Sequence, residues 1–294
     1  MNIDASALLG KRVAAVINTS SGGCDGTASD KIRAVLDRAG LTAATVVAVT
    51  SGELVAALDA ALNACDVLVL LGGDGTIRVA ADKAGAAGIP LIPLPGGTMN
   101  MLAHALYGPI GWEQALSATL ADPEVRTVSG GKAQGRSFYC VAILGTPALW
   151  ADAREALRRG DLIAAVARSA TAIRRSGGHR LRYQMGDTLR GEAEAVAVIC
   201  PLVSRSLTQN DQVLEAVALD PETASEAFRL ALHAMFDNWR FDPAVALAKV
   251  TTVTLTGHGR IPVILDGEIM NMGRAVTIRF HPTAFHAITP TVRT

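Results

Sequence analysis

The chain has 294 residues, of which 50% are hydrophobic and 18% are charged. This composition is typical of a folded protein and excludes an intrinsically disordered one. The 27 basic and 27 acidic residues cancel, so no overall charge would recruit nucleic acid. The chain is long for one hydrophobic core, and we therefore expect two domains.

The amino terminus and the cysteines indicate a cytoplasmic protein. Residues 1–10 include Asp4 and lack the basic start and apolar core of a signal peptide. No run of 18 apolar residues occurs, so a membrane-spanning helix is not expected. The four cysteines form no paired metal-ligand spacing and are expected to be free thiols in a reducing compartment. They are Cys24, Cys65, Cys140 and Cys200.

Residues 1–122 alternate expected strands with expected helices. The strands are expected at residues 12–17, 42–49, 67–71 and 91–94. The helices are expected at residues 27–39, 54–63 and 77–87. This alternation predicts an α/β domain with a doubly wound parallel sheet. In such a sheet the ligand lies beyond the carboxyl ends of the strands.

Three polar or glycine-rich loops follow strands of this expected sheet, at residues 18–23, 72–76 and 95–100. Glycine lets the backbone turn sharply and brings amide groups close to a ligand, which favours phosphate. Asp74 in the second loop suits a metal ion or a reacting hydroxyl group. Neither G-x-x-x-x-G-K-[ST] nor a G-x-G-x-x-G after the first strand occurs. We therefore expect backbone amides and Mg²⁺ to hold a polyphosphate.

Residues 123–294 change to short, often alternating strands that turn signals separate. Strand-like runs occur at residues 125–128, 137–144, 179–184, 193–199, 213–219, 250–256, 261–265 and 275–280. Helical segments interrupt them at residues 148–175 and 223–236. This half predicts a mainly antiparallel β domain with inserted helices, and a return of the last residues to the first domain is left open.

Three motifs in order resemble the diacylglycerol kinase catalytic family: G-G-D-G-T at 72–76, P-G-G-T-M-N at 95–100 and D-G-E at 266–268. That family includes bacterial lipid kinases, sphingosine kinases and ceramide kinases. NAD kinases share the first motif, whereas the T-x-N turn and the late D-G-E favour the lipid kinases. The resemblance implies an α/β nucleotide-binding domain, a β-rich lipid-substrate domain after residue 122, and ATP and Mg²⁺ as cofactors.

The resemblance also implies a nucleotide site built from the three loops and from neighbouring positions. Its cofactor-binding residues would be Asn18, Thr19, Ser20, Ser21, Gly22, Thr50, Gly72, Gly73, Asp74, Gly75, Thr76, Arg78, Gly97, Thr98 and Asn100. A separate metal position would be formed by Thr208, Asp211 and the backbone of Val213.

The reaction would need a general base, because a lipid alcohol is a weak nucleophile. The family's base is drawn from the carboxylates that Asp266 and Glu268 match, while Asp74 matches the acid proposed for that role in sphingosine kinases. All three therefore stay open as catalytic residues. From the residues alone, Asp266-Gly267 is also an ordinary hairpin turn.

Several positions depart from the family pattern. The chain has Arg78 and Val79 where the family usually has Asn-Glu, so a carboxylate is lost and a cation that could hold a phosphate is gained. A second acid is lost where Pro147 stands in place of aspartate. Other changes replace the family's Pro, Asp and Gly by Thr19, Met101 and Gln212.

A basic segment bears on the substrate. Residues 154–182 hold eight arginines against Glu155 and Asp161, a local excess of eight less two, or six, positive charges. Apolar residues lie among them, and Trp150 stands just ahead. An amphipathic basic region suits peripheral contact with an anionic membrane surface, at about 1 kcal/mol per basic residue. A solvated helix face is the alternative interpretation.

We therefore expect a cytoplasmic lipid kinase, peripherally associated with membrane, that transfers the γ-phosphate of ATP to a lipid hydroxyl group. Its partner would be a lipid substrate, either a ceramide, a sphingoid base or a diacylglycerol, and no nucleic acid is expected. An NAD kinase and a catalytically inactive nucleotide-binding regulatory protein are the alternatives. The sequence leaves the oligomeric state open.

Overall fold

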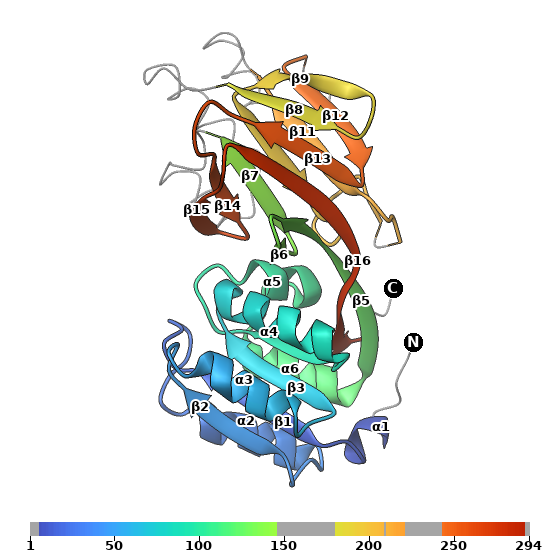
Figure 1. The fold of residues 1–294 in the computed structure, drawn as a ribbon. Coiled ribbons are helices and arrows are strands. Elements are labelled where there is room, and N and C mark those ends of the chain that lie inside the picture. Colours follow the sequence, from blue (N-terminus) through green and yellow to red (C-terminus); the bar gives the residue numbers. More distant parts are fainter. Residues whose placement is uncertain (1–5, 146–179, 209, 221–242, 292–294) are drawn as a thin grey trace. The chain divides into compact units, whose positions relative to one another are not determined.

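The computed structural model describes residues 6–145, 180–208, 210–220 and 243–291. The chain divides into two compact units (Figure 1). Unit 1 consists of Met1–Val128 with Thr283–Thr294, and unit 2 consists of Ser129–Pro282. The boundaries fall inside two long strands, β5 (Pro123–Ala133) and β16 (Ala275–Pro290). Each of these strands therefore belongs in part to both units.

Unit 1 is built on a parallel sheet. Its strands are β1 (Val13–Asn18), β2 (Thr45–Val49), β3 (Val67–Gly72) and β4 (Leu91–Pro95). The strand order is β2-β1-β3-β4, and the last part of β16 pairs in parallel with β4, Ala287 opposite Leu91. The order reverses between β1 and β3, as in a doubly wound sheet, where ligands bind beyond the carboxyl ends of the strands. The predicted doubly wound parallel sheet is confirmed.

Helices cover both faces of this sheet (Figure 1). They are α1 (Ser6–Leu9), α2 (Ala28–Arg38), α3 (Leu54–Leu62), α4 (Asp74–Ala87), α5 (Met101–Tyr107) and α6 (Trp112–Ala121). The three predicted helices are present as α2, α3 and α4, and α4 begins three residues before the prediction because Asp74 opens its first turn. The sequence patterns did not predict α1, α5 or α6. The first two are too short to show a helical period, with four and seven residues.

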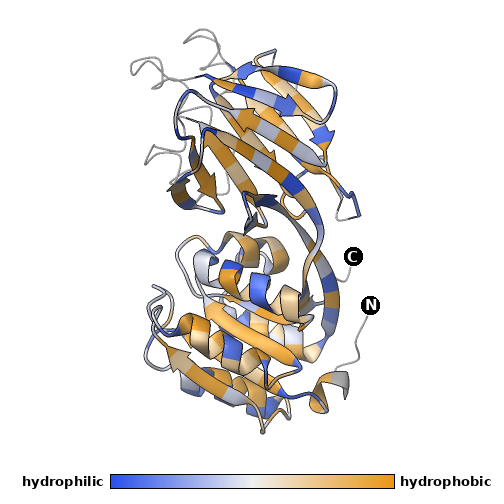
Figure 2. Cartoon of the chain, in the orientation of Figure 1, coloured by the Kyte–Doolittle hydropathy of each residue, from blue (hydrophilic) through white to orange (hydrophobic). Residues whose placement is uncertain are grey.

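Strand β3 is the centre of unit 1. Its side chains from Val67 to Leu71 have exposed fractions of only 0–3%, and the strand is hydrophobic along its length (Figure 2). Strands β1 and β4 pair with it on either side. Since both faces are covered, apolar residues stand at consecutive positions rather than at alternate ones. The buried strand therefore holds Gly72 and the turn after it in a fixed place.

Unit 2 contains two antiparallel sheets. In one, the first part of β16 pairs with β13 (Thr252–Thr256), which is followed by β8 (Leu181–Met185) and β9 (Leu189–Ala193). The other has the order β12-β11-β10-β7-β14-β15. Its strands are β7 (Val141–Gly145), β10 (Ala195–Ile199), β11 (Leu214–Leu219), β12 (Val245–Val250), β14 (Pro262–Leu265) and β15 (Glu268–Asn271).

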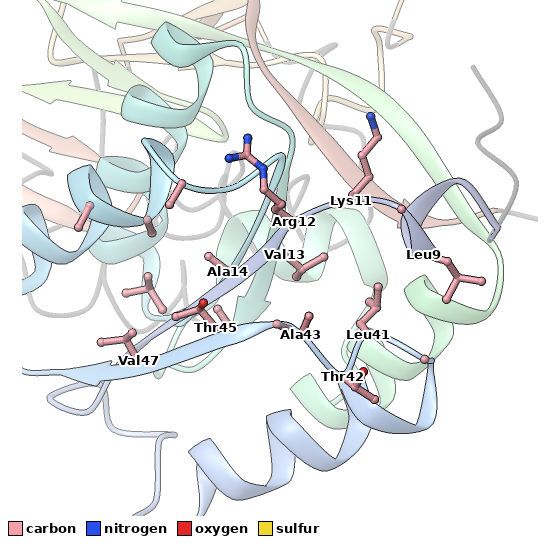
Figure 3. A pocket seen from close by; sticks show the side chains of 18 of the residues that line it. Leu9, Lys11, Arg12, Val13, Ala14, Leu41, Thr42, Ala43, Thr45 and Val47 are labelled. Atoms are coloured by element: carbon pink, nitrogen blue, oxygen red, sulfur yellow. The ribbon is translucent and has the colours of Figure 1, made fainter.

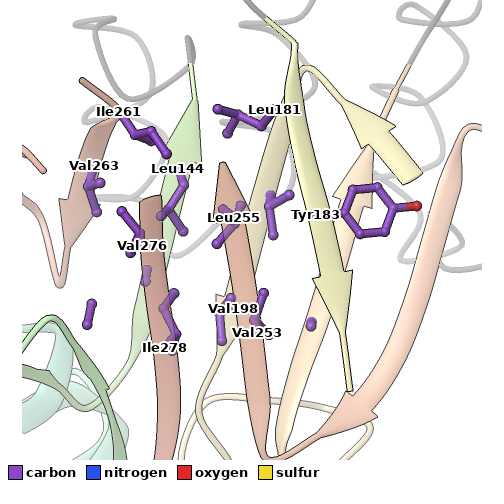
Figure 4. Packing of buried hydrophobic residues seen from close by; sticks show 14 of the residues in the cluster. Leu144, Leu181, Tyr183, Val198, Val253, Leu255, Ile261, Val263, Val276 and Ile278 are labelled. Carbon is purple, nitrogen blue, oxygen red and sulfur yellow. The ribbon is translucent and has the colours of Figure 1, made fainter. Parts of the chain in front are cut away.

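One hydrophobic cluster joins the two sheets of unit 2 (Figure 4). Leu144 and Val198 enter it from one sheet, and Val253, Leu255 and Ile278 enter it from the other. Only every second residue of each strand takes part, as expected when a sheet presents one face to a shared core. The predicted antiparallel β half is confirmed by this arrangement.

The strand predictions for unit 2 need two corrections. Strands β9, β12 and β15 were not predicted. The run at residues 137–144, predicted as one strand, is broken into β6 (Arg136–Phe138) and β7. The physical reason is that the N–H groups of Tyr139 and Cys140, at the break, bind the side-chain carboxylate of Asp266.

Other predicted features lie outside the described residues. They are the helices at 148–175 and 223–236, Trp150, Pro147 and most of the basic segment. Of its eight arginines, the structure describes Arg180 and Arg182, which both form ion pairs with Glu192. Within the described ranges, no helix combines the length and the apolar character needed to cross a bilayer.

An ion pair beside β1 and β3 makes the stability of unit 1 depend on pH. Hydrogen bonds from the Arg12 guanidinium and the Arg12 N–H lower the pKa of Asp66 from 3.8 to about 2. A carboxyl group with a lowered pKa stabilises the folded state above the unfolded value and loses that contribution as the pH falls toward the folded value. The effect is small because both side chains are partly exposed.

We therefore expect Asp66→Asn to be less stable than the wild type at neutral pH, with a difference that shrinks between about pH 4 and pH 2. Denaturant unfolding followed by circular dichroism measures the stability of the two proteins at each pH. Arg12→Lys is the matched control, since it keeps the charge but loses the paired guanidinium bonds, and it should lose part of the contribution. A difference that is constant over this pH range would contradict the assignment.

Candidate active site

Three loops of unit 1 meet at the carboxyl ends of β1, β3 and β4. The Gly23 N–H, after β1, donates to the Gly96 carbonyl at 2.9 Å. The Gly96 N–H in turn donates to the Gly72 carbonyl at 2.9 Å, and the Gly73 N–H donates to the Ser21 hydroxyl at 3.1 Å. The structure therefore brings together the loops from which the sequence predicts a polyphosphate site.

Two glycines of the turn after β4 are required by its contact with the turn after β3. A Cβ atom on Gly97 would lie 2.5 Å from the Cα atom of Gly73, and one on Gly96 would lie 2.8 Å from the Gly72 nitrogen. No side chain larger than a hydrogen atom fits at such distances. Packing of one turn against the other thus accounts for Gly96 and Gly97 independently of any ligand.

Asn18 ties the loops together from the end of β1. It is only 4% exposed. Its amide nitrogen donates to the Thr76 hydroxyl at 2.8 Å, and its amide oxygen accepts the Ser20 N–H at 3.1 Å and the Ser51 hydroxyl at 3.3 Å. Ser51 is a site residue that the sequence did not predict, because its partner Asn18 stands 33 residues earlier in the chain. Asn18 therefore supports the loops through three bonds inside the fold.

Asn100 closes the turn after β4. It has φ 51° and ψ 39°, in the left-handed region that asparagine tolerates better than most residues. Its side-chain oxygen accepts the Gly97 N–H at 2.7 Å, and its nitrogen donates to the Gly97 carbonyl at 2.8 Å. Thr98, at the tip of the turn, is exposed, and its hydroxyl lies 3.9 Å from the place of a Cβ atom on Gly22. The tip therefore lies beside the loop after β1.

Asp74 is the first residue of α4 and lies against the start of α5. Its carboxylate accepts the Leu102 N–H at 3.4 Å. Burial raises the pKa of Asp74 above its usual value, while the backbone amides of Leu102, Met101 and Asn100 and the nearby His104 act in the opposite direction. A carboxylate in this setting gains from a bound cation, because the cation offsets the loss of solvation.

Backbone N–H groups at the start of α4 complete the site. The first N–H groups of a helix have no acceptor within it. In α4 these belong to Asp74, Gly75 and Thr76, whereas the Ile77 N–H bonds to the Gly73 carbonyl at 2.9 Å. They carry the positive end of the helix dipole, which attracts phosphate. A phosphate group there would lie beside both the amides and the Asp74 carboxylate.

Two predicted nucleotide-binding residues have their hydrogen-bonding groups engaged in the fold. Thr19 donates its N–H and its hydroxyl to the Val49 carbonyl at 2.9 and 3.0 Å. Thr50 donates its N–H and its hydroxyl to the Glu53 carboxylate at 3.0 and 2.8 Å, in the turn before α3. Arg78 lies half-buried on α4.

The predicted separate metal position lies in the loop before β11. The Asp211 carboxylate accepts the Thr208 N–H at 2.6 Å and the Thr208 hydroxyl at 3.1 Å, and these bonds lower the pKa of Asp211. Val213 stands two residues further along. No three His, Cys, Asp or Glu side chains gather as a metal site in the part of the chain that the structure describes. A cation here would have to share Asp211 with Thr208.

The other two predicted catalytic carboxylates lie in unit 2. Asp266 is in the turn between β14 and β15, and Glu268 is the first residue of β15. Asp266 is 6% exposed, whereas Glu268 is half-buried. Asp74 belongs to unit 1, so the structure describes the three candidates in two separate groups.

A pocket of about 690 Å³ lies elsewhere in unit 1 (Figure 3). It is lined by residues 9–16, by residues 40–45 with Val47, and by alanines of α3 and Ala64 just after it. None of the predicted nucleotide-binding residues lines it. It includes the first residues of β1 and β2, whereas doubly wound sheets bind ligands beyond the carboxyl ends of their strands. The predicted nucleotide-binding residues therefore lie at the glycine turns and not in this pocket.

Residues 12–133 match the family model of the diacylglycerol kinase catalytic domain. This part of the chain is similar to the diacylglycerol kinase catalytic family. The resemblance predicted from the motifs is thus confirmed. The matched residues contain the three loops and Asp74. The match ends at residue 133, before the turn that carries Asp266 and Glu268. No curated protein matches the sequence.

Solved structures with a similar fold cover nearly the whole chain. Two are of a Bacillus anthracis str. Sterne protein provisionally named a diacylglycerol kinase, with TM-scores of 0.75 and 0.74 at 18% identity. They cover 95% and 94% of this chain and 97% and 96% of their own. A third, named a diacylglycerol kinase of that organism, has a TM-score of 0.68 at 15% identity and covers 95% of this chain and 96% of its own. Identities this low show a shared fold.

We expect Gly97→Ala to lower the free energy of unfolding by about 1–3 kcal/mol, because the new Cβ atom forces the two turns apart. Denaturant unfolding measures the change. Gly26→Ala is the matched control, since a Cβ atom there would meet no atom within 4 Å. Equal effects of the two substitutions would contradict the close packing of the turns.

We expect Asp74→Asn to be at least as stable as the wild type at pH 7 without ligands. The raised pKa of Asp74 means that ionisation of this group costs folding stability as the pH rises above the unfolded value. The variant has no such cost, and the two proteins should become equal in acid, where Asp74 is protonated. Thermal unfolding at pH 7 and in acid measures the two stabilities. A variant clearly less stable than the wild type at pH 7 would overturn the prediction.

Proposed function

We propose that the protein is an ATP-dependent lipid kinase that transfers the γ-phosphate to a hydroxyl group of a membrane lipid. The supporting observation is the meeting of two glycine turns with Asp74 at the start of α4, within a segment of the diacylglycerol kinase catalytic family. Ceramide, a sphingoid base and diacylglycerol are the candidate acceptors. The names of the structural neighbours agree with a lipid acceptor.

Phosphoryl transfer depends on positioning and on neutralising charge rather than on covalent chemistry of the protein. The N–H groups of Gly75 and Thr76 would hold phosphate oxygens, and the α4 dipole would stabilise the charge that develops during transfer. The loop after β1 would border the nucleotide, held in place by the bonds of Asn18. Arg78, one turn further along α4, would add a positive charge.

A magnesium ion carried by the nucleotide phosphates fits the residues present. Mg²⁺ commonly uses one or two carboxylates and keeps several waters. Asp74 offers one half-buried carboxylate beside the turn, and no acidic cluster that would hold a metal by protein ligands alone occurs among the described residues. When bound, the ion would neutralise charge on the transferring phosphate. Asp74 would hold it on the α4 side.

A carboxylate would accept the proton of the lipid hydroxyl as the phosphate bond forms. Asp74 is assigned to the metal in this proposal. Asp266 and Glu268 of unit 2 then remain as the candidates for the general base, and they stand two residues apart at one turn.

Peripheral contact with an anionic membrane and a cytoplasmic location are part of the proposal. The support is the basic sequence at residues 154–182, preceded by Trp150. Arg180 and Arg182 are already paired with Glu192. Membrane contact would therefore depend on the other arginines of the segment.

A protein that binds nucleotide without transferring phosphate is the second candidate. Val79 and Met101 favour it, because they replace acids that the family usually carries. An NAD kinase has less support, because the segment with the shared motif matches the diacylglycerol kinase family.

The test is an assay with γ-labelled ATP, Mg²⁺ and a panel of lipids in mixed micelles, with NAD in a parallel reaction. We expect label in a lipid phosphate and a loss of at least about 100-fold in Asp74→Asn. Asp82→Asn is the matched control, since Asp82 lies on the same helix two turns further along. It should keep most of the activity.

The other outcomes separate the alternatives. Labelled NADP would contradict a lipid acceptor. Nucleotide binding without transfer to any acceptor would favour the regulatory protein. A protein that binds no nucleotide would contradict the site itself.

A further inference from the structure

Three successive backbone N–H groups of unit 2 converge on the carboxylate of Asp266. Tyr139 donates to Oδ2 at 2.6 Å, and Cys140 and Val141 donate to Oδ1 at 2.9 and 2.8 Å. Successive amides that point to one spot form an anion-binding nest. In this protein the nest at residues 139–141 is filled by a side chain of the chain itself.

The turn that carries Asp266 is built for this contact. Asp266 and Gly267 have φ values of 45° and 89°, the left-handed conformations that a two-residue type I′ hairpin turn requires. The Asp266 N–H also donates to the Val141 carbonyl at 2.9 Å. Leu265 pairs with Ala142 of β7 and with Glu268 of β15. Backbone and side chain of Asp266 therefore both attach the turn to the start of β7.

The same bonds make Asp266 a poor general base. A base must present an oxygen lone pair to the substrate hydroxyl. Asp266 is 6% exposed, and its two carboxylate oxygens already accept three N–H groups. Taking up a proton would turn an accepting oxygen into a donor, although the three N–H groups that it meets are themselves donors. Glu268, which is half-buried, stands at the first position of β15, and its place depends on this turn.

We propose that Asp266 is a positioning residue whose carboxylate fills the nest of the Tyr139, Cys140 and Val141 N–H groups. It thereby fixes the turn that carries Glu268, and it also fixes the break between β6 and β7. The catalytic part of this inference rests on the proposed kinase function. The contact itself does not, because it lies wholly within unit 2.

The test compares Asp266→Asn with Glu268→Gln, each a neutral replacement of similar shape. Asparagine tolerates the left-handed backbone, but its NH₂ group would face one of the N–H donors. For Asp266→Asn we expect amide exchange at residues 139–141 to become at least about tenfold faster and the melting temperature to fall by about 5 °C or more. Glu268→Gln should change neither.

The pH profile of kcat/KM distinguishes a positioning residue from a general base. With the lipid that the wild type phosphorylates, Asp266→Asn should be slower but should keep the acidic limb of the pH profile of kcat/KM. An unchanged melting temperature and exchange, with the acidic limb lost and kcat reduced at least about 100-fold, would show that Asp266 is the base.

The wild-type protein alone supplies a second check, should Asp266→Asn fail to fold. The amides of Tyr139, Cys140 and Val141 must belong to its slowly exchanging set, and fast exchange there would overturn the proposal. A wild type that transfers phosphate to no acceptor would instead contradict the kinase function. The exchange and melting measurements would then still decide whether Asp266 holds the nest.

Discussion

Close packing of two glycine turns is the constraint on which the proposed nucleotide site of this protein depends. Gly96 and Gly97 let the turn after β4 touch the backbone of the turn after β3. That contact places the start of α5 beside Asp74, and the Gly96 carbonyl holds the loop after β1. The lack of side chains also leaves the amides at the start of α4 open to a ligand. One requirement therefore serves both packing and binding.

Two carboxylates, one half-buried and one buried, meet backbone amides in opposite ways. Asp74 accepts the Leu102 N–H over a long 3.4 Å, and burial still raises its pKa. Asp266 accepts three N–H groups at 2.6–2.9 Å. The first carboxylate retains a need for a cation, whereas the second is satisfied by the fold. Both stand at turns that follow strands, so sequence position alone cannot distinguish the proposed metal ligand from the proposed supporting residue.

Local patterns predicted the parts of this structure that depend on local chemistry. The sequence indicated a strand at residues 67–71 and a sharp turn at the glycines after it, and the parallel sheet followed from the alternation with helices. Such patterns could not predict contacts between segments that are far apart in the sequence. The bond from Ser51 to Asn18 and the break at Tyr139 both arise from residues far apart in sequence. Asp266 read as an ordinary hairpin turn because its partners lie more than 120 residues earlier.

Hydrogen–deuterium exchange with and without Mg²⁺ and ATP tests the central claim most directly, because it maps where nucleotide meets the backbone. The glycine-turn site predicts slower exchange at residues 18–22, 72–76 and 96–100 when nucleotide is bound. The Asp74→Asn variant should lose that protection at the same nucleotide concentration. Protection confined to the pocket at residues 9–16 and 40–47, or no change at saturating nucleotide, would contradict the assignment.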